Sequence, residues 1–369
     1  AKGNGTTSFG ITAFDFSPLT SGTDGGGIFL CTSGTTGTPK GILLREEQLA
    51  HVASSVVESH RLGRLDRGYC SLPLFHVNAE VVGLLGTLRA GAYLAVDSRF
   101  SRRGFWDLIE AERITWINAV PAIISILSMD PPTDPPKRLR FVRSASAPLP
   151  IASLERFEKA LGVPVIETYG MTEAASMITA NPVDGPRKPG SAGKPAGSEV
   201  RVELPSGGPA DHGDIGRVLI RGTGVITGYA SGGRPGAFDD GWLDTGDLGY
   251  TDADGYLFLV GRSDDVINRG GEKIYPREIE EILLAQPGVR SAAVIGARDE
   301  VLGERPVAYV VPEADVDADA VAALLRGACA ERLPRHKRPS EFHFLDRLPL
   351  GQTGKISRRL LKDLVAARP

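Results

Sequence analysis

Residues 31–41, CTSGTTGTPKG, combine glycines, hydroxyl side chains and one lysine in a strip that has no bulky side chain. They directly follow the apolar run 28–30, which predicts a short buried strand. A turn of this composition can aim backbone N–H groups and hydroxyls at one anion, and Lys40 adds a cation beside it. Pro39 stands where the common P-loop motif has a glycine before its lysine, so the strip is not that motif. The pattern favours a phosphate-binding loop, with an exposed surface loop as the alternative.

Two further stretches carry groups suited to a nucleotide. In ETYGMTE, residues 167–173, Tyr169 offers an aromatic face close to the hydroxyl of Thr172 and the carboxylate of Glu173. In WLDTGDLG, residues 242–249, Asp247 lies in a glycine turn. Its carboxylate could accept hydrogen bonds from both hydroxyls of a ribose. Each residue also has an ordinary structural explanation, as a core tyrosine or a capping aspartate.

Two basic residues stand in glycine-containing stretches late in the chain. Arg262 belongs to GRSDDVINRGGEK, residues 261–273, and Lys355 belongs to PLGQTGKISRRL, residues 349–360. Solvated surface positions are the alternative for both. The stretch RGTGVITG, residues 221–228, only approximates a dinucleotide-binding fingerprint, and turn chemistry explains it.

The elements that must position these groups divide into two kinds. Between residues 46 and 168, helical patterns alternate with four short β-rich runs, AYLAVD, ITWINAV, LRFVRSA and VPVIET. This alternation predicts a mostly parallel sheet covered by helices. From residue 188 to residue 261 the sequence becomes glycine-rich and includes GRVLIRG and GYLFLVG, which predicts an antiparallel β section.

A second unit follows the GRSDD stretch. It contains the helical pattern PREIEEILLA, the strand patterns SAAVIGA and RPVAYVV, a longer helix near residues 317–332 and a terminal helix. About a hundred residues with their own apolar pattern predict a small α+β domain. We therefore expect an α/β large domain over residues 1–261 and a second domain over residues 262–369.

The composition excludes several other classes of protein. The 42 basic and 45 acidic residues leave a net charge of −3 without long runs of one sign, which favours neither a nucleic-acid nor an anionic-membrane partner. The three cysteines are widely separated, as in reduced thiols rather than a disulfide framework. The apolar stretch 114–129 is too short to span a bilayer and is read as a strand followed by a helix. With no signal-peptide pattern in its first residues, the chain is expected to be cytoplasmic.

Taken in this order, the five motifs resemble the adenylate-forming superfamily of acyl-CoA synthetases, adenylation domains of peptide synthetases and luciferases. The resemblance runs from about residue 27 to residue 360. It implies a large domain that binds ATP and an acid, closed by a small mobile C-terminal lid domain. It also implies ATP-dependent activation of a carboxylic acid to an acyl-adenylate with release of pyrophosphate, and then transfer to the thiol of CoA. ATP, Mg²⁺ and CoA are the implied cofactors.

The resemblance assigns the nucleotide to particular residues. The glycine and hydroxyl strip matches the loop around the β- and γ-phosphates, and Tyr169 matches the residue that stacks on adenine. Asp247 and Arg262 match ribose contacts, while the backbone at residues 146–148 matches the other side of the adenine. The implied nucleotide-binding residues are Ser33, Thr35, Thr36, Lys40, Ser146, Ala147, Pro148, Tyr169, Asp247 and Arg262.

The implied catalytic residues are Lys355, Thr172, Glu173 and His76. Lys355 matches the lysine that bridges the attacking carboxylate and the α-phosphate, and Glu173 matches the Mg²⁺ ligand. Because the attack brings like charges together, positioning and cationic neutralisation are the expected sources of catalysis. No general base is needed, since the acid is already ionised at neutral pH.

Rotation of the small domain should bring residues 268–276 over the site for the transfer step. Asp264 stands at the position of the family's hinge residue. Gly270 and Gly271 lack side chains, and the resemblance implies that the pantetheine thiol passes beside them.

The implied acid pocket comprises His76, Asn78, Val120, Ser146, Ser176 and Met177. The motif sequences most resemble those of small-acid CoA ligases such as oxalate–CoA ligases. That branch places a histidine three residues after the glutamate of its TE motif, where this chain has Ser176. Oxalate is therefore not the expected substrate, and an aliphatic or aromatic monocarboxylic acid is at least as consistent with the sequence.

Two alternatives to a CoA ligase stay open at this point. One is a stand-alone adenylation enzyme that loads an acyl-carrier protein or another acceptor, and the other is a catalytically silent ATP-binding relative. The resemblance also implies that the family's first lobe, which packs on the central one, is missing before residue 27. Exposed apolar surface is expected where that lobe would pack.

Overall fold

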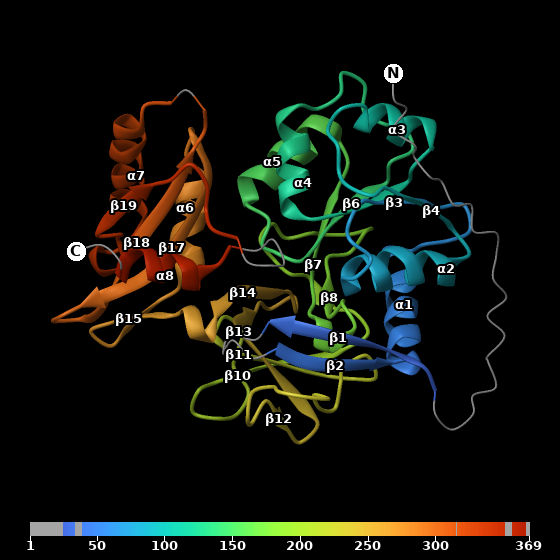
Figure 1. The fold of residues 1–369 in the computed structure, drawn as a ribbon, viewed down its shortest axis with the longest axis horizontal. Coiled ribbons are helices and arrows are strands. Elements are labelled where there is room, and N and C mark those ends of the chain that lie inside the picture. The colour runs from blue at the N-terminus through green and yellow to red at the C-terminus, as the bar shows by residue number, and fades with distance from the viewer. Residues whose placement is uncertain (1–24, 34–38, 315, 351–355, 367–369) are drawn as a thin grey trace.

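The computed structural model describes residues 25–33, 39–314, 316–350 and 356–366. Two units stand side by side in Figure 1, a larger one built from the chain up to β14 and a smaller one built from β15 onward. The predicted fold class, a helix-covered mostly parallel sheet with an antiparallel section and a small α+β unit, is confirmed.

A seven-stranded sheet forms the centre of the large unit, in the order β4-β3-β5-β6-β7-β8-β9. Pairing is parallel from β4 to β7 and antiparallel from β7 to β9. The strands are β3 (Arg67–Cys70), β4 (Tyr93–Val96), β5 (Trp116–Ala119), β6 (Phe141–Ser144), β7 (Val165–Tyr169), β8 (Thr179–Ala180) and β9 (Lys194–Pro195). The four β-rich runs read from the sequence are β4 to β7.

Helices cover both faces of this sheet (Figure 1). They are α1 (Glu46–His60), the π-helix η1 (Asn78–Leu85), α2 (Gly86–Ala90), α3 (Phe105–Ala111), α4 (Pro121–Met129) and α5 (Ile151–Leu161). Successive strand residues enter opposite cores, as Phe141 and Val142 do on β6. The sequence revealed these strands because short β-rich runs alternate with helical patterns along this part of the chain.

An antiparallel sheet follows, in the order β10-β11-β13-β12 with β14 also paired to β13. Its strands are β10 (Glu199–Glu203), β11 (Gly216–Arg221), β12 (Phe238–Asp239), β13 (Trp242–Thr251) and β14 (Leu257–Arg262). The sheet carries Asp247 on β13 directly opposite Arg262 on β14. Register thus brings two of the predicted nucleotide contacts together.

The C-terminal unit has its own five-stranded sheet and its own apolar core. The strands are β15 (Ile267–Arg269), β16 (Glu272–Ile274), β17 (Val289–Asp299), β18 (Gly303–Pro312) and β19 (Glu341–Phe344). The helices are α6 (Pro276–Leu284), α7 (Ala318–Arg332) and α8 (Arg358–Ala366). Short 3₁₀ turns are η2 (Thr172–Ala174), η3 (Ser263–Asp265) and η4 (Arg335–Lys337). Turn η3 joins the last strand of the large unit to β15.

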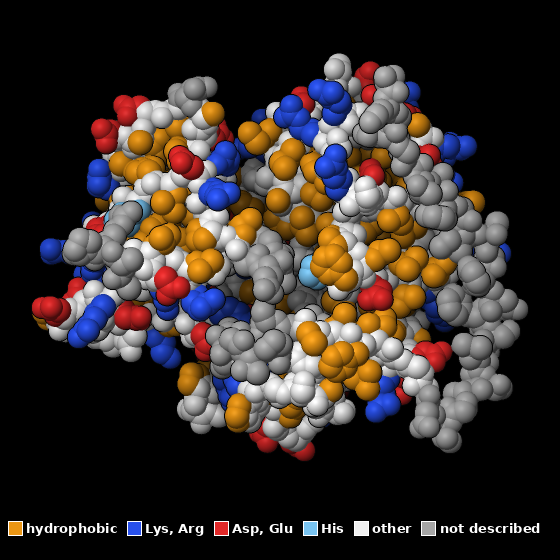
Figure 2. Space-filling view, viewed as in Figure 1, with side chains coloured by type: hydrophobic (Ala, Val, Ile, Leu, Met, Phe, Trp, Pro, Cys, Tyr) orange, Lys and Arg blue, Asp and Glu red, His pale blue; other side chains and the backbone are white. Residues whose placement is uncertain are grey.

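The apolar run at residues 28–30 is a strand, as predicted, but only one of its faces is covered. Ile28 and Leu30 are half-buried against the core, whereas Phe29 is exposed. The run belongs to β1 (Gly27–Ser33), which pairs only with β2 (Pro39–Arg45) in a two-stranded sheet. Ile42 and Leu44 of β2 are fully buried on one face, whereas the Phe29 side chain is 56% exposed on the other. Within the described residues no further layer covers that outer face, and Figure 2 shows hydrophobic side chains gathered around it.

No helix among the described residues is both long enough and apolar enough to cross a membrane. The stretch 114–129 is instead β5 followed by α4, as the sequence predicted.

Candidate nucleotide and acid site

Lys40 lies on β2 at the end of the predicted phosphate loop. Its side chain is half-buried, and its Nζ stands 5.1 Å from the centre of the Tyr229 ring. A lysine ammonium over an aromatic face is attracted by the ring quadrupole, so Tyr229 orients this cation. Thr35, Thr36 and the side chain of Ser33 lie outside the described residues.

Tyr229 also holds the predicted metal ligand. Its hydroxyl donates to Oε1 of Glu173 at 3.1 Å, and the Glu173 side chain is only 6% exposed. Burial and the neighbouring Glu173 carboxylate both raise the pKa of the Tyr229 phenol, so it stays a hydrogen-bond donor at neutral pH. One side chain thus contacts both the cation and the carboxylate that the sequence placed near the phosphates.

Backbone hydrogen bonds hold the loop that carries Tyr229 on both sides of this residue. The Ile226 backbone N–H donates to the Glu173 carbonyl, and the backbones of Gly41 and Ser231 are paired beside Lys40. This loop continues the stretch that the sequence analysis assigned to turn chemistry alone. Sequence reasoning therefore missed Tyr229, although an aromatic residue directly after Gly228 was the available signal.

The predicted ribose contacts do converge. The Tyr169 hydroxyl donates to Oδ2 of Asp247 at 2.5 Å, and Arg262 Nη1 lies 3.3 Å from Oδ1 of the same carboxylate. Gly246 has φ +77°, and a Cβ there would approach Arg262 Nη2 to 2.8 Å. The left-handed backbone favours glycine here, and a side chain would also displace the Arg262 guanidinium from its place beside Asp247. Burial, then Asp247, raises the pKa of the Tyr169 phenol well above its ordinary value.

Part of the predicted acid pocket is also brought together. Asn78, the first residue of η1, donates from Nδ2 to the hydroxyl of Ser146 at 3.1 Å. Ser146, Ala147 and Pro148 are exposed after β6. Val120 is the N-terminal cap residue of α4, and the half-buried His76 has its ring centre 4.5 Å from that of Phe75.

Ser176 and Met177 occupy more enclosed positions. Ser176 is 6% exposed with φ +105°, an uncommon backbone for a residue with a side chain. Met177 is completely buried in the core between β2 and α1, and its sulfur lies 3.8 Å from the Ser59 hydroxyl. Strained backbone of this kind often occurs at functional sites, whereas Met177 has a sufficient explanation as core packing.

The hinge and thiol residues lie at the start of the C-terminal unit. Asp264 is exposed in η3, and Gly270 and Gly271 form the turn between β15 and β16 with φ +60° and +92°. Two consecutive left-handed residues explain the glycine pair as hairpin chemistry, independently of any thiol. Lys355 lies outside the described residues.

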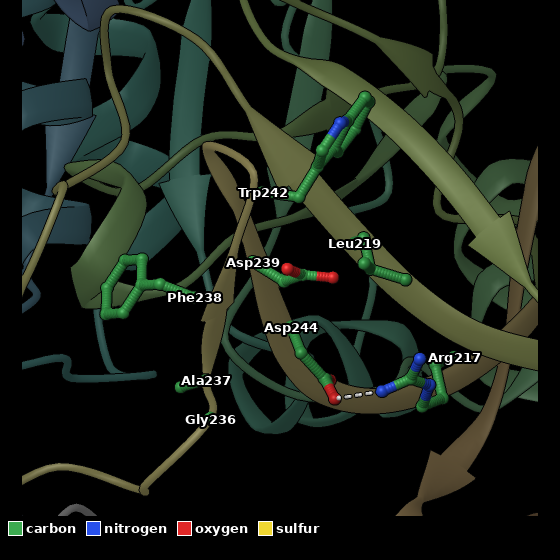
Figure 3. A pocket seen from close by; sticks show the side chains of 8 residues that line it. All are labelled: Arg217, Leu219, Gly236, Ala237, Phe238, Asp239, Trp242 and Asp244. Carbon is green, nitrogen blue, oxygen red and sulfur yellow. Dashed lines mark hydrogen bonds and ion pairs between the residues drawn. The ribbon is translucent and has the colours of Figure 1, made fainter. Parts of the chain in front are cut away.

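A separate pocket opens on the antiparallel sheet between β11, β12 and β13, as Figure 3 shows. Asp244 and Arg217 form an ion pair across it at 3.4 Å, and Trp242 lines its far side. None of the predicted site residues lines this pocket.

Over the described residues there is no cluster of three or more side chains suited to a metal ion. Glu173 is a single buried carboxylate, which fits a Mg²⁺ ion that takes most of its other ligands from water and substrate phosphates. The donor chemistry therefore fits ATP with Mg²⁺, and it does not fit a dedicated protein cage for a metal.

Comparison with known proteins gives the class of protein. A family model described as AMP-binding enzyme matches residues 28–230, and one described as AMP-binding enzyme C-terminal domain matches residues 278–355. The chain therefore belongs to the AMP-binding enzyme family, and the predicted relationship to adenylate-forming enzymes is confirmed.

Two curated relatives illustrate the similarity. Sulfoacetate–CoA ligase of Cupriavidus necator is 44% identical over 91% of this chain and 66% of its own length. Oxalate–CoA ligase of Arabidopsis thaliana is 39% identical over 94% of this chain and 69% of its own length. The chain thus spans about two thirds of the length of the curated relatives it matches.

Solved structures agree with these relatives. ATP-bound MatB from Rhodopseudomonas palustris superposes with a TM-score of 0.84 at 32% identity, covering 92% of this chain and 68% of that one. O-succinylbenzoate coenzyme A synthetase from Bacillus subtilis, in complex with ATP and magnesium ion, superposes with a TM-score of 0.82 at 34% identity. That match covers 91% of this chain and 69% of the other.

Proposed function

We propose that this protein activates a carboxylic acid with ATP and transfers the acyl group to CoA. The observation that supports this most is the convergence of Tyr169 and Arg262 on the Asp247 carboxylate. The shared contacts of Tyr229 with Lys40 and Glu173 give the same support at the phosphate end. The names of the relatives, which are CoA ligases, point in the same direction.

In the first step an oxygen of the acid's carboxylate bonds to the α-phosphorus of ATP, and the bond from that phosphorus to the leaving pyrophosphate breaks. No proton moves, because the nucleophile is already an anion. Lys40 neutralises charge on the β- and γ-phosphates, while Asp247 and Arg262 fix the ribose, so the residues act by positioning and charge stabilisation. Mg²⁺ held by Glu173 would stabilise the leaving pyrophosphate.

In the second step the CoA thiol releases its proton to water and its sulfur bonds to the acyl carbon. The bond between that carbon and the phosphate oxygen of AMP breaks, and AMP leaves. We assign residues 262–369 as the lid that exchanges position between the two steps, with Asp264 as its hinge. Lys355 serves the first step, and the turn at Gly270 and Gly271 serves the second. Exchanging the lid lets one site perform both reactions.

The acceptor distinguishes this proposal from its main alternative. A stand-alone adenylation enzyme would release pyrophosphate with its acid but form no thioester with CoA, and would need a carrier-protein phosphopantetheine. A silent ATP-binding relative would release no pyrophosphate with any acid. We favour CoA because the curated relatives are named for it.

The test is to screen a library of acids for pyrophosphate release, with hydroxylamine present to trap the acyl-adenylate. The screen is then repeated with CoA. Lys355→Ala is expected to lower acid-dependent pyrophosphate release by about 10²–10³-fold, because removing one preorganised charge-stabilising group has that cost. Lys137→Ala, which removes an exposed lysine of the large unit, is the matched control and should retain the rate. Equal loss in thioester formation from a pre-made acyl-adenylate would contradict the assignment of Lys355 to the first step.

A further inference from the structure

Helix α6 of the C-terminal unit lies on the side that faces the large unit (Figure 1) and packs against β14. Two of its four charged side chains, Glu278 and Glu280, form ion pairs at 2.7 Å with basic residues of their own unit. The other two are Arg277, at the start of the helix, and Glu281, one turn later. These two reach the large unit, and the proposed mechanism assigns no role to either.

Arg277 and Glu281 contact backbone groups of the large unit. Arg277 Nη1 donates to the carbonyl oxygen of Leu259 on β14 at 2.9 Å. The Ile151 N–H, at the start of α5, donates to Oε2 of Glu281 at 3.4 Å. The cap residue of α5 is Pro150, whose side chain cannot accept a hydrogen bond, so a carboxylate from the other unit takes this place. Each hydrogen bond crosses between the units and has a charged group of α6 at one end.

The same two side chains also hold each other in place. Arg277 Nε lies 3.7 Å from Oε1 of Glu281, and the two side chains are 17% and 25% exposed. Water and salt screen a partly buried ion pair less than one on an open surface. Hydrogen bonds that involve an ionised group are also stronger than neutral ones. Breaking these contacts should therefore have a larger effect than breaking an exposed salt bridge.

A buried carboxylate of the large unit faces this pair. Glu167 on β7 is 8% exposed and accepts the Gly190 N–H at 3.0 Å. Burial raises its pKa, the Gly190 N–H and the charge of Arg277 lower it, and the charge of Glu281 raises it to a smaller extent. Moving the C-terminal unit away would remove the Arg277 cation from beside this carboxylate. Arg277 therefore stabilises the arrangement of the two units seen here, which is called the docked position below.

We propose that Arg277 is a positioning residue that holds α6 against the large unit, and that this contact must break for the C-terminal unit to pass between its two working positions. This rests on the proposed function, in which that unit exchanges position between adenylation and thioester formation. A rotation that moves α6 away from α5 separates Glu281 from Ile151, so these contacts belong to one of the two positions. Arg277 thus sets how the protein divides its time between the half-reactions.

The first measurement is the distance between the two units, which needs no substrate. Fluorescent donor and acceptor labels are attached at exposed positions of α5 and α7, through Glu155→Cys and Ala323→Cys. Every labelled protein also carries Cys31→Ser, because Cys31 is exposed whereas the other two cysteines are buried. Arg277→Met should lower the ratio of docked to undocked protein about tenfold, as expected for loss of a hydrogen bond from a charged group.

The second measurement follows the two half-reactions separately on unlabelled protein, as acid-dependent pyrophosphate release and as thioester formation from a pre-made acyl-adenylate. In Arg277→Met the half-reaction performed in the docked position should slow, while the other keeps its rate or accelerates. The ratio of the two rates should change at least about fivefold. Arg277→Lys should recover part of this change because it retains the charge. Glu278→Gln removes a charge that pairs within the C-terminal unit, and this matched control should alter neither measurement.

An unchanged distance distribution in Arg277→Met would overturn the inference. Equal loss of both half-reactions would also overturn it, because a merely structural role slows both alike. Arg277 lies outside the apolar core of the C-terminal unit, so its replacement should leave that unit folded. Absence of pyrophosphate release with every acid would instead reject the proposed function, and the distance measurement would still decide whether Arg277 holds the two units together.

Discussion

Glu167 on β7 is a buried carboxylate whose charge should link stability to pH. Burial raises its pKa to about 7, and the Gly190 N–H and Arg277 only partly offset this. Glu158 of α5 and Glu281 of α6 also face it and raise the pKa slightly. Because the folded state holds this proton more tightly than the unfolded chain, stability is greatest below pH 4.5 and is lost as the pH rises through 7.

Glu167→Gln should therefore raise the free energy of unfolding at pH 8, by up to about 3 kcal/mol, and change it little at pH 5. The amide oxygen of glutamine can still accept from the Gly190 N–H, which donates to Glu167 at 3.0 Å. Chemical unfolding at both pH values measures the effect, with Glu155→Gln on the exposed face of α5 as control. A gain of equal size at both pH values would show that the carboxyl is not the titrating group.

Tyr229 supports a second residue-scale prediction. Tyr229→Phe removes the hydrogen bond to the Glu173 carboxylate and retains the ring beneath Lys40. The Mg²⁺ concentration for half-maximal pyrophosphate release should rise roughly tenfold, since a hydrogen bond to a charged group contributes about 1.5–3 kcal/mol. Tyr250→Phe, whose ring stacks on Phe258, is the control. A lower rate with an unchanged Mg²⁺ dependence would contradict this role for Tyr229.

At the scale of elements, the sequence predicted those strands that have a recognisable local residue pattern. Strands β4 to β7 were found because each lies in a short run rich in aliphatic, aromatic and β-branched residues between helical patterns. Strands β8 and β9 have two residues each, too few for any period to be visible. The hairpin β1–β2 was found as a strand, but only one of its faces is buried, since Phe29 and Leu43 face outward while Ile42 and Leu44 face the core.

The same limit applies to the candidate site. Tyr169, Asp247 and Arg262 could be proposed together because each stands in a recognisable motif, and strand register then joins two of them. Tyr229 could not, because its role depends on a contact with Glu173, which lies 56 positions away in the sequence. The aromatic residue after Gly228 is visible in the sequence, but its pairing with Glu173 is revealed only by the folded chain.

At the scale of the whole molecule, the joint between the two units is anchored on both sides of one residue. The Ser263 hydroxyl donates to the Gly246 carbonyl of the large unit at 3.2 Å. Asp265 pairs with Arg358 of α8 at 3.2 Å, and Arg358 also pairs with Glu280 of α6 in the C-terminal unit. Asp264 lies between these two anchors and is exposed. A rotation of one unit against the other would therefore concentrate backbone change at Asp264.

Asp264→Pro should leave acid-dependent pyrophosphate release largely intact and nearly abolish transfer to CoA. Proline fixes φ near −65° and removes an N–H, so a backbone that must adopt two conformations loses one of them. Asp264→Ala is the matched control, because it removes the carboxylate and keeps the backbone free. Pyrophosphate release and thioester formation are measured separately on each variant. Equal loss of both half-reactions in Asp264→Pro would remove Asp264 as the pivot and direct the same substitution to Ser263 and Asp265.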